Sequence, residues 1–320
     1  MGKERVKNHR PLDYKEYFAQ YQDLIPDYLE FLECLKKQHR QYFCINTLKI
    51  RTNEEKERLL EILRQKNIQF ESVQEVPYFY RVVNNEEVSL GNLEEYSLGL
   101  IHSMTLASSL PIIALDPQPG DLVLDLCAAP GGKTCLIAII TQDRATVVAN
   151  DKRVDRLTAL VANLKRLGVA SAITTRYRGE QFPFGIPFNK VLVDAPCSGE
   201  GRYRVGLEGE ILYQKGHGKT NLQSIQKGLL VRAFDLLSPG GVLVYSTCTI
   251  NPKENEEVVD YLLRKRQAKL VDWISPLSYY EGITEWEGKP YHPDLRLTKR
   301  YYTHKIDAVG FFVAKIIKLV

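Results

Sequence analysis

Residues 121–134, DLVLDLCAAPGGKT, carry the strongest architectural signal in this chain. Residues 121–127 are a short apolar run, which predicts a buried β-strand. Residues 127–134, CAAPGGKT, predict a glycine turn that leads into an apolar helix. A turn of this kind offers backbone N–H groups to a ligand at the carboxyl end of the strand. We therefore expect the ligand-binding part of an α/β fold to begin here.

The alternation of strands and helices continues toward the C-terminus. The helix predicted over 153–167 has its apolar residues on one face and ends at Gly168, a residue type suited to a helix C-terminus. Further strands are predicted at 145–151, 171–177, 189–195 and 241–248, and a closing strand at 310–319. This β-α-β pattern predicts a mainly parallel, doubly wound sheet.

The residues before this unit show a different organisation. Residues 1–40 are rich in aromatic residues and predict helices, and YFCINTLKI (42–50) predicts a strand. Thr52 followed by Glu55 forms a capping box for a helix that runs to about Lys66. Strand-like segments follow at FESV and FYRVV. We expect a small α+β unit that ends near residue 95.

Composition narrows the class of protein. The chain has 320 residues, of which 44% are hydrophobic and 26% charged, as in a soluble globular protein of one large or two modest domains. A net charge of +4 permits a nucleic-acid partner without requiring one. No apolar run is long enough for a bilayer, and the N-terminus lacks a secretory signal. The six cysteines are scattered without a C-x-x-C pair, so we expect a cytoplasmic protein with reduced thiols and no metal.

Three ligands compete for the glycine turn. A phosphate-binding Walker A loop requires a glycine where Cys127 stands, and the dinucleotide pattern G-x-G-x-x-G is absent. A turn for S-adenosylmethionine requires an acid at the end of the next strand, about 20 residues on, to bind the ribose hydroxyls. Asp151 lies there, although the same residue type could instead cap the helix that follows. The combination of turn and acid favours S-adenosylmethionine.

Two cysteines follow two other predicted strands. Asp194 and Cys197 lie in DAPCSGEG (194–201), and Cys248 lies in YSTCT. A lone cysteine at a strand end is more often packing, but two thiols and an acid at one edge of a sheet favour chemistry. A thiolate that adds to carbon 6 of cytosine activates carbon 5 toward a methyl sulfonium, which is covalent catalysis. Lys133, near the same crevice, could lower a thiol pKa or contact the base.

Three motifs resemble those of the Sun-family (NSUN-type) RNA cytosine-C5 methyltransferases. They are LDLCAAPGGKT (124–134), DAPCSGEG (194–201) and YSTCTINPKENEEVV (245–259). Weaker similarity is found in INTLK (45–49), HSMTLASSLP (102–111) and GFFVAK (310–315), so the resemblance covers most of residues 42–320. It implies a Rossmann-like class I methyltransferase domain preceded by a small α+β domain of the RNA-recognition (RRM-like) type. The implied units are a helical segment (1–40), the RRM-like domain (41–100) and the methyltransferase domain (101–320).

The resemblance also implies roles for single residues. Cys248 attacks carbon 6, and Cys197 assists breakdown of the covalent adduct and release of the product. Asp194 and Lys133 contact the base. The implied cofactor-binding residues are Cys127, Ala128, Ala129, Pro130, Gly131, Gly132, Lys133, Asp151, Arg156 and Asp194.

Two positions depart from the family pattern. The family has an aspartate near the end of the third strand, opposite the adenine; here Arg178 stands there, with Glu180 two residues on. Cys44 replaces the usual arginine of the N-terminal R-V-N-T-L-K segment.

In NPKENEEVV the residues predict a helix start, with Asn251 as N-cap, Pro252 at the first helical position and Glu254 at the third. We therefore assign that segment a structural role, outside the site.

Three segments mix basic and aromatic residues that could bind RNA: residues 3–10, GRYRVG (201–206) and RLTKRYYTHK (296–305). Each segment alone is more often an ordinary solvated surface, and GRYR is the favoured RNA-binding candidate because it follows Cys197. Residues 208–221 predict a flexible loop with hinge positions at Gly206, Gly209, Gly216 and Gly218.

The sequence therefore predicts an S-adenosylmethionine-dependent cytosine-C5 methyltransferase acting on tRNA or rRNA, with the target base flipped or single-stranded. A DNA cytosine-C5 methyltransferase would lack the second cysteine, Cys248. A noncatalytic RNA-binding factor would be indicated by loss of Cys248 or Asp194, and both are present.

Overall fold

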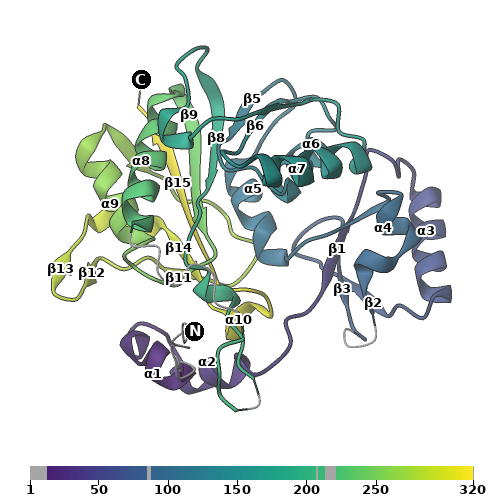
Figure 1. The fold of residues 1–320 in the computed structure, drawn as a ribbon, viewed down its shortest axis with the longest axis horizontal. Coiled ribbons are helices and arrows are strands. Elements are labelled where there is room, and N and C mark those ends of the chain that lie inside the picture. The colour runs from purple at the N-terminus through teal and green to yellow at the C-terminus, as the bar shows by residue number, and fades with distance from the viewer. Residues whose placement is uncertain (1–12, 85–87, 207, 213–220, 320) are drawn as a thin grey trace, which may run out of the picture.

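The computed structural model describes residues 13–84, 88–206, 208–212 and 221–319 (Figure 1). Two sheets organise these residues, one of four strands near the N-terminus and one of nine strands after it. A small hairpin, β12 (Glu285–Trp286) and β13 (Lys289–Pro290), stands apart from both. Within these ranges no helix is long and apolar enough to cross a membrane.

The nine-stranded sheet is mixed, so the prediction of a mainly parallel sheet is right for one half only. The strands run in the order β11, β14, β15, β9, β8, β5, β6, β7, and β10 pairs with β15. The half from β9 to β7 is parallel, whereas β15, β10, β14 and β11 pair antiparallel. The apolar pattern of a strand is the same in either direction, so the sequence did not reveal this reversal.

The predicted strands of this sheet are present. They are β5 (Leu122–Asp125), β6 (Thr146–Asn150), β7 (Ala172–Thr175), β8 (Phe188–Asp194), β9 (Leu237–Thr247) and β15 (Phe311–Lys318). The sequence did not predict the short strands β10 (Ala268–Leu270), β11 (Tyr280–Glu281) and β14 (Lys299–Tyr301). A strand of two or three residues is too short to show a periodic pattern.

Helices cover both faces of the large sheet (Figure 1). Val123 and Val244 pack with α5 (Leu110–Leu115) and α6 (Gly132–Ile140) on one face. Their neighbours Leu124 and Leu243 pack with α8 (Leu222–Asp235) and α9 (Glu256–Lys265) on the other. Successive side chains of a strand point to opposite faces, which is why adjacent residues join different clusters. The predicted helix 153–167 is α7 (Val154–Leu167), which packs beside α6 and ends at Gly168 in the left-handed conformation.

The smaller sheet has the strand order β2, β3, β1, β4, all antiparallel. Along the chain its unit runs β1 (Tyr42–Ile45), α3 (Asn53–Gln65), β2 (Phe70–Ser72), β3 (Phe79–Val82), α4 (Glu94–Ser97) and β4 (Ile101–Ser103). The capping box is confirmed, because Thr52 Oγ1 accepts from the Glu55 N–H and Glu55 accepts from the Thr52 N–H. The strand predicted over 42–50 ends at Ile45, where a turn begins.

Both faces of the smaller sheet are covered. Phe43 and Ile45 pack on α3, whereas Tyr42 and Cys44 join the core of the large unit. Cys44 is fully buried and lies between the two units. Lys49, also in the segment that resembles an RNA-binding motif, donates from Nζ to the carbonyls of Leu98 and Arg166 at 2.7 Å each. Cys44 therefore offers no surface to RNA, whereas Lys49 is exposed but its ammonium group is held by two backbone carbonyls.

The N-terminal helical prediction is confirmed for α1 (Tyr14–Phe18) and α2 (Tyr28–Cys34), with a 3₁₀ turn, η1 (Ala19–Tyr21), after α1. The basic segment 3–10 lies outside the described residues. This N-terminal segment packs in a cluster with Tyr203, Ile250 and Tyr302, so it lies against the large unit close to both cysteine loops (Figure 1). Short connections complete the fold: η2 (Leu90–Asn92), η3 (Leu106–Ser109), η4 (Gly179–Gln181), η5 (Glu200–Arg202), η6 (Pro293–Leu297) and α10 (Thr303–Ile306).

Candidate active site

Two thiols meet at the edge of the large sheet. Cys197 follows β8 and Cys248 follows β9, and these strands are parallel neighbours with Asp194 in register with Ser246. The two Sγ atoms are 3.4 Å apart, and both cysteines are free thiols. The Gly201 N–H donates to the Cys248 carbonyl at 3.0 Å, which joins the two loops through their backbones.

The surroundings of the two thiols are unequal. The pKa of Cys248 is lowered by the hydrogen bond from the Cys197 thiol and by the nearby cations Arg202 and Lys133, against opposing effects of burial and Asp194. The pKa of Cys197 is raised well above its ordinary value by its hydrogen bond to Cys248, by burial, and by the carboxylates Glu254 and Asp194. This asymmetry favours Cys248 as the thiolate and Cys197 as the neutral partner that donates to it.

A lysine and an aspartate border the thiol pair. Lys133 Nζ and Asp194 Oδ2 form an ion pair at 2.8 Å, and the Ser246 hydroxyl donates to Asp194 Oδ1 at 3.0 Å. Lys133 lies on the first turn of α6 and also packs over the Phe311 ring. The Asp194 side chain keeps about a third of its surface exposed, so it can still contact a ligand in the crevice.

The glycine turn is shaped by packing. Gly131 has φ +106°, and a Cβ there would lie 2.7 Å from Leu160 Cδ1 of α7. Gly131 is thus needed where the turn passes α7, and its predicted contact with the cofactor stays a prediction. Arg156 donates to the Ala129 carbonyl, which ties α7 to the same turn.

Asp151 is a buried carboxylate at the end of β6. It pairs with Arg156 Nη1 at 3.1 Å, and its Oδ1 accepts from the Arg153 N–H at 2.9 Å. The second contact is of the capping kind, although the N-cap position of α7 is Arg153 itself. The contact with Arg153 supports the helix-capping alternative, and ligand binding by Asp151 stays a prediction.

Another buried acid, Asp125, was missed by the sequence analysis. It ends β5, accepts from the Thr134 hydroxyl at 2.7 Å, and its Oδ1 has no partner within the described residues. Burial raises its pKa to about 7. Asp125 stands in the segment DLVLDLC (121–127), which was interpreted only as a buried strand, although an acid in an apolar strand is unusual.

Arg178 immediately precedes η4, and Glu180 lies within it. Arg178 is largely exposed, with its Nη2 3.9 Å from Glu180 Oε1. The Glu180 side chain lies against Gly228 of α8 and lines an open, polar groove of about 780 Å³ along that helix. The groove reaches the cysteine loops through Glu254 and Asn251.

Glu254 is not at the start of α9, as the sequence predicted, but supports the Cys197 loop. Helix α9 begins at Glu256, and Asn251 caps a preceding turn by accepting from the Lys253 N–H. Glu254 is buried, and its Oε2 accepts from the Ser198 N–H at 3.0 Å and from Gln226 Nε2 at 2.8 Å. Gln226 also donates to the Pro196 carbonyl, so both side chains hold the Cys197 loop.

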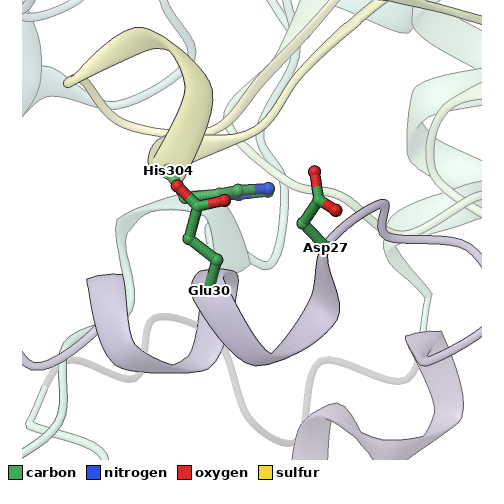
Figure 2. A group of neighbouring side chains, drawn as sticks. All are labelled: Asp27, Glu30 and His304. Carbon is green, nitrogen blue, oxygen red and sulfur yellow. The ribbon is translucent and has the colours of Figure 1, made fainter.

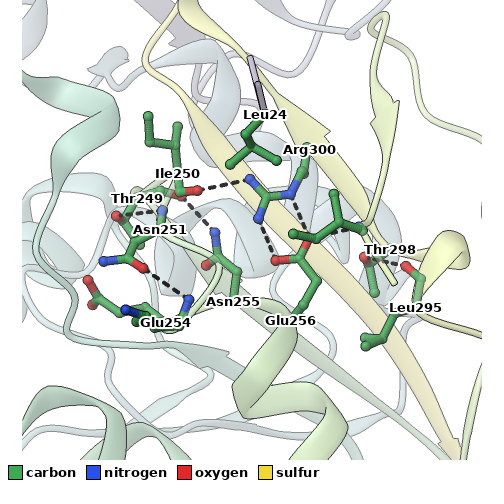
Figure 3. Close-up of polar contacts among 12 residues, drawn as sticks. Leu24, Thr249, Ile250, Asn251, Glu254, Asn255, Glu256, Leu295, Thr298 and Arg300 are labelled. Carbon is green, nitrogen blue, oxygen red and sulfur yellow. Dashed lines mark hydrogen bonds and ion pairs between the residues drawn. The ribbon is translucent and has the colours of Figure 1, made fainter. Parts of the chain in front are cut away.

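Side chains from β14 and from the turn before α9 hold the loop that follows Cys248 (Figure 3). Asn255 Nδ2 donates to the Thr249 carbonyl at 3.0 Å, and Arg300 Nη1 donates to the Ile250 carbonyl at 2.9 Å. Arg300 also forms a buried ion pair with Glu256. The side chains of Figure 3 thus connect β14 and the start of α9 to the segment that carries the thiol.

In two of the segments predicted to bind RNA, basic or aromatic side chains are buried. In 296–305, Lys299, Arg300, Tyr301 and Tyr302 are buried, because the segment forms β14 inside the sheet. In GRYRVG, Tyr203 is buried in the N-terminal cluster, whereas Arg202 is exposed and acts electrostatically on Cys248. Of the loop 208–221, residues 213–220, with Gly216 and Gly218, lie outside the described residues.

One group of side chains has a composition that could bind a metal. Asp27, Glu30 and His304 bring their ligand atoms within 4.8 Å of one another (Figure 2). Lys305 Nζ, however, already pairs with Asp27 at 2.7 Å and with Glu30 at 3.0 Å, and His304 Nε2 lies 2.9 Å from the Pro26 carbonyl oxygen. An ammonium group between the carboxylates neutralises the charge that a cation would need.

Comparison with known proteins identifies the fold and the family. Residues 112–317 match the family described as 16S rRNA methyltransferase RsmB/F. The chain belongs to this methyltransferase family. It is 38% identical to the tRNA (cytosine(49)-C(5))-methyltransferase of Pyrococcus abyssi, over 96% of this chain and 99% of that protein. It is 36% identical to the 28S rRNA (cytosine-C(5))-methyltransferase of Mus musculus over 92% of its length, and spans 37% of the mouse protein.

Solved structures show the same fold. A methyltransferase homolog protein from Pyrococcus horikoshii superposes with a TM-score of 0.80 at 31% identity, covering 95% of each chain. NSun6 from Pyrococcus horikoshii shares the fold, with a TM-score of 0.78 at 23% identity over 97% of this chain and 98% of that one. This RsmB/F-family protein is thus a class I methyltransferase with a mixed sheet, and S-adenosylmethionine is its methyl donor.

The donor set of the site fits that cofactor. Asp151 and Asp194 are carboxylates at the ends of β6 and β8, on either side of the glycine turn after β5. Carboxylates in such positions can accept from ribose hydroxyls and from an α-amino group, and the turn offers backbone N–H groups.

Proposed function

We propose that this chain methylates carbon 5 of a cytosine in tRNA or rRNA through a covalent bond between Cys248 and carbon 6, with Cys197 assisting release. The relatives named above are cytosine-C5 methyltransferases of tRNA and rRNA. The observation that carries the proposal is the pair of thiols whose Sγ atoms are 3.4 Å apart. Arg202 and Lys133 lower the pKa of Cys248, whereas Glu254 and Asp194 raise the pKa of Cys197.

The chemistry follows from that asymmetry. The Cys248 thiolate uses an electron pair to form an S–C6 bond, and the electrons of the C5–C6 double bond move to carbon 5. Bound S-adenosylmethionine would supply an electrophilic methyl group, which carbon 5 takes as the methyl–sulfur bond breaks and S-adenosylhomocysteine leaves. A base then removes the proton on carbon 5, which restores the double bond and expels Cys248 as a thiolate. Cys197, held protonated against Cys248, is placed to assist this last step.

Asp194 and Lys133 would position the base. The Asp194 carboxylate can accept a hydrogen bond from the exocyclic amine of cytosine, and Lys133 holds that carboxylate at 2.8 Å. Lys133 also lowers the pKa of Cys248, so one cation serves both the orientation of the acid and the charge of the nucleophile. Asp151, Arg156 and residues 127–133 would hold the cofactor.

We include residues 41–100 in the proposal as an RRM-like, RNA-binding domain, residues 1–40 as a helical segment and 101–320 as the methyltransferase domain. The β-α-β-β-α-β order and the strand order of the small sheet support this assignment. An RRM usually binds RNA on the sheet face opposite its helices. That face is packed on the large unit, so RNA contact by residues 41–100 would use α3 or the sheet edges.

The experiment traps the covalent intermediate. Cys197→Ala, Cys248→Ala and the control Cys34→Ala are incubated with S-adenosylmethionine and cellular RNA, and protein–RNA adducts are separated on a denaturing gel. We expect a stable adduct with Cys197→Ala, none with Cys248→Ala, and parental turnover with Cys34→Ala. An adduct that forms only with Cys248→Ala would reverse the two roles. Absence of adduct and of methyl transfer on any RNA would refute the proposal.

A further inference from the structure

A buried glutamate lies beneath the two cysteine loops. Glu200 follows Cys197 by three residues and is 2% exposed. Its Oε1 accepts from the Tyr17 hydroxyl at 2.7 Å, and its Oε2 accepts from Tyr21 at 3.0 Å and from Thr249 at 3.2 Å. A buried carboxylate is costly unless hydrogen bonds satisfy it, so three hydroxyl groups on one acid indicate a built feature.

This arrangement joins the two thiol loops through directed hydrogen bonds. Thr249, the residue after Cys248, gives its only hydroxyl proton to Glu200. The contact of 2.8 Å between the Thr249 and Ser198 hydroxyls must therefore have Ser198, the residue after Cys197, as its donor. As the acceptor from Thr249, Glu200 thus sets the direction of a chain of hydrogen bonds that runs from the Cys197 loop to the Cys248 loop, although burial raises the pKa of Glu200 to about 7.

Two of the three donors come from far away in the sequence. Tyr17 and Tyr21 lie on α1 and η1 and are separated from Glu200 by 183 and 179 residues. The N-terminal segment is held there by a cluster that includes Phe18 and Tyr203. Neither the methyltransferase motifs nor the cofactor chemistry requires these tyrosines.

We propose that Glu200 is a positioning residue which, with Tyr17, Tyr21 and Thr249, holds the two cysteine loops at the separation where Cys197 hydrogen-bonds to Cys248. The N-terminal helical segment thereby contributes two hydrogen-bond donors, Tyr17 and Tyr21, to the positioning of the cysteine loops. The effect on methyl transfer rests on the proposed function, whereas the effect on the Cys248 thiol does not.

The first measurement is independent of methyl transfer. The rate of iodoacetamide alkylation of Cys248, followed by mass spectrometry as a function of pH, reports the state of that partly exposed thiol. The charged groups that act on it are Asp194, Arg202 and Lys133, besides its partner Cys197, and none is altered. Thr249→Val removes the hydroxyl with little change of shape, Thr249→Ser keeps it, and Tyr21→Phe removes one donor. Tyr28→Phe changes a tyrosine of the same segment that does not contact Glu200.

We expect the midpoint of alkylation to rise by on the order of one pH unit in Thr249→Val and Tyr21→Phe. Thr249→Ser should stay closer to the parent than Thr249→Val, and Tyr28→Phe should match the parent. A loss of stability alone would lower the melting temperature without moving this midpoint in the folded protein. Unchanged midpoints in Thr249→Val and Tyr21→Phe would refute the positioning role.

The second measurement uses the protein with both thiols in place. Methyl transfer at saturating RNA should be at least tenfold slower in Tyr21→Phe than in the parent, with the RNA concentration at half-saturation unchanged. A shifted alkylation midpoint together with no adduct in Cys197→Ala would retain the positioning role and refute the proposed function. Methyl transfer by Tyr21→Phe at the parental rate would refute the coupling to catalysis.

Discussion

Replacement of Arg300 by methionine tests whether this residue supports the fold or binds RNA. Its guanidinium is 2% exposed, pairs with the fully buried Glu256, and donates to the Ile250 carbonyl at 2.9 Å. Arg300→Met leaves the Glu256 carboxylate buried, with the Ile283 N–H at 3.3 Å as its one remaining donor among the residues that the structure describes. Breaking a buried pair on one side costs about 3–5 kcal/mol, and the lost carbonyl contact is part of that cost. We expect the free energy of unfolding to fall by ~4 kcal/mol.

Urea denaturation followed by circular dichroism measures this loss. Arg296→Met, which replaces an exposed arginine of the same segment, should change the free energy of unfolding by less than ~0.5 kcal/mol, as is usual for surface sites. The double variant Arg300→Met with Glu256→Gln should recover part of the loss, because it removes the uncompensated charge. A loss below about 1 kcal/mol for Arg300→Met, with a weaker salt dependence of RNA binding, would show that Arg300 contacts phosphate and would contradict the buried-pair argument.

Three further outcomes follow from other residues. Burial raises the pKa of Asp125 to about 7, so the folded state holds a proton that the unfolded state loses near pH 4, and stability should fall as pH rises through that window. Urea denaturation from pH 4 to 8 should show a larger fall in the free energy of unfolding for the parent than for Asp125→Asn, with a difference of at most ~4 kcal/mol. Equal pH profiles of the two proteins would contradict the raised pKa. Gly131→Ala should cost about 1–3 kcal/mol in the same assay, because φ is +106° and the new Cβ meets Leu160; an unchanged stability would show that the turn rearranges freely. Asp151→Asn should weaken S-adenosylmethionine binding, measured by calorimetry, about tenfold or more without changing the affinity for RNA, because a charge-assisted hydrogen bond is lost. An unchanged affinity for the cofactor would show that Asp151 serves only to hold α7.

The strands and helices around the site were predictable because their signals are local. An apolar run followed by a polar or glycine turn places β5, β6, β8 and β9 with their ends at one edge of the sheet. Asp194, Cys197 and Cys248 follow such strands, so their proximity could be inferred before any distance was known.

The errors share a physical cause, which is that burial depends on residues far away in the sequence. Lys299 and Arg300 look like surface cations, but Asp272 and Glu256 lie 27 and 44 residues away and supply their counter-charges. Glu254 looks like a helix-capping acid until Gln226 and the Ser198 N–H are placed beside it.

The direction of the outer half of the sheet was hidden for a related reason. β15 has the apolar pattern of a buried strand, but whether it runs parallel or antiparallel to β9 depends on the path of the chain after α9. That path includes strands of two or three residues, which carry no periodic signal.

What could be inferred from the residues alone is the type of chemistry: a cofactor turn, two thiols and an acid on the ligand-binding edge of a sheet. These follow from short-range patterns and from motif spacing. The chain's folding in space sets the 3.4 Å between the thiols, the opposite shifts of their pKa values, and the hydroxyl groups around Glu200. Those features arise from groups up to 183 residues apart, and electrostatic and hydrogen-bond energies depend on distance in space rather than on separation along the chain.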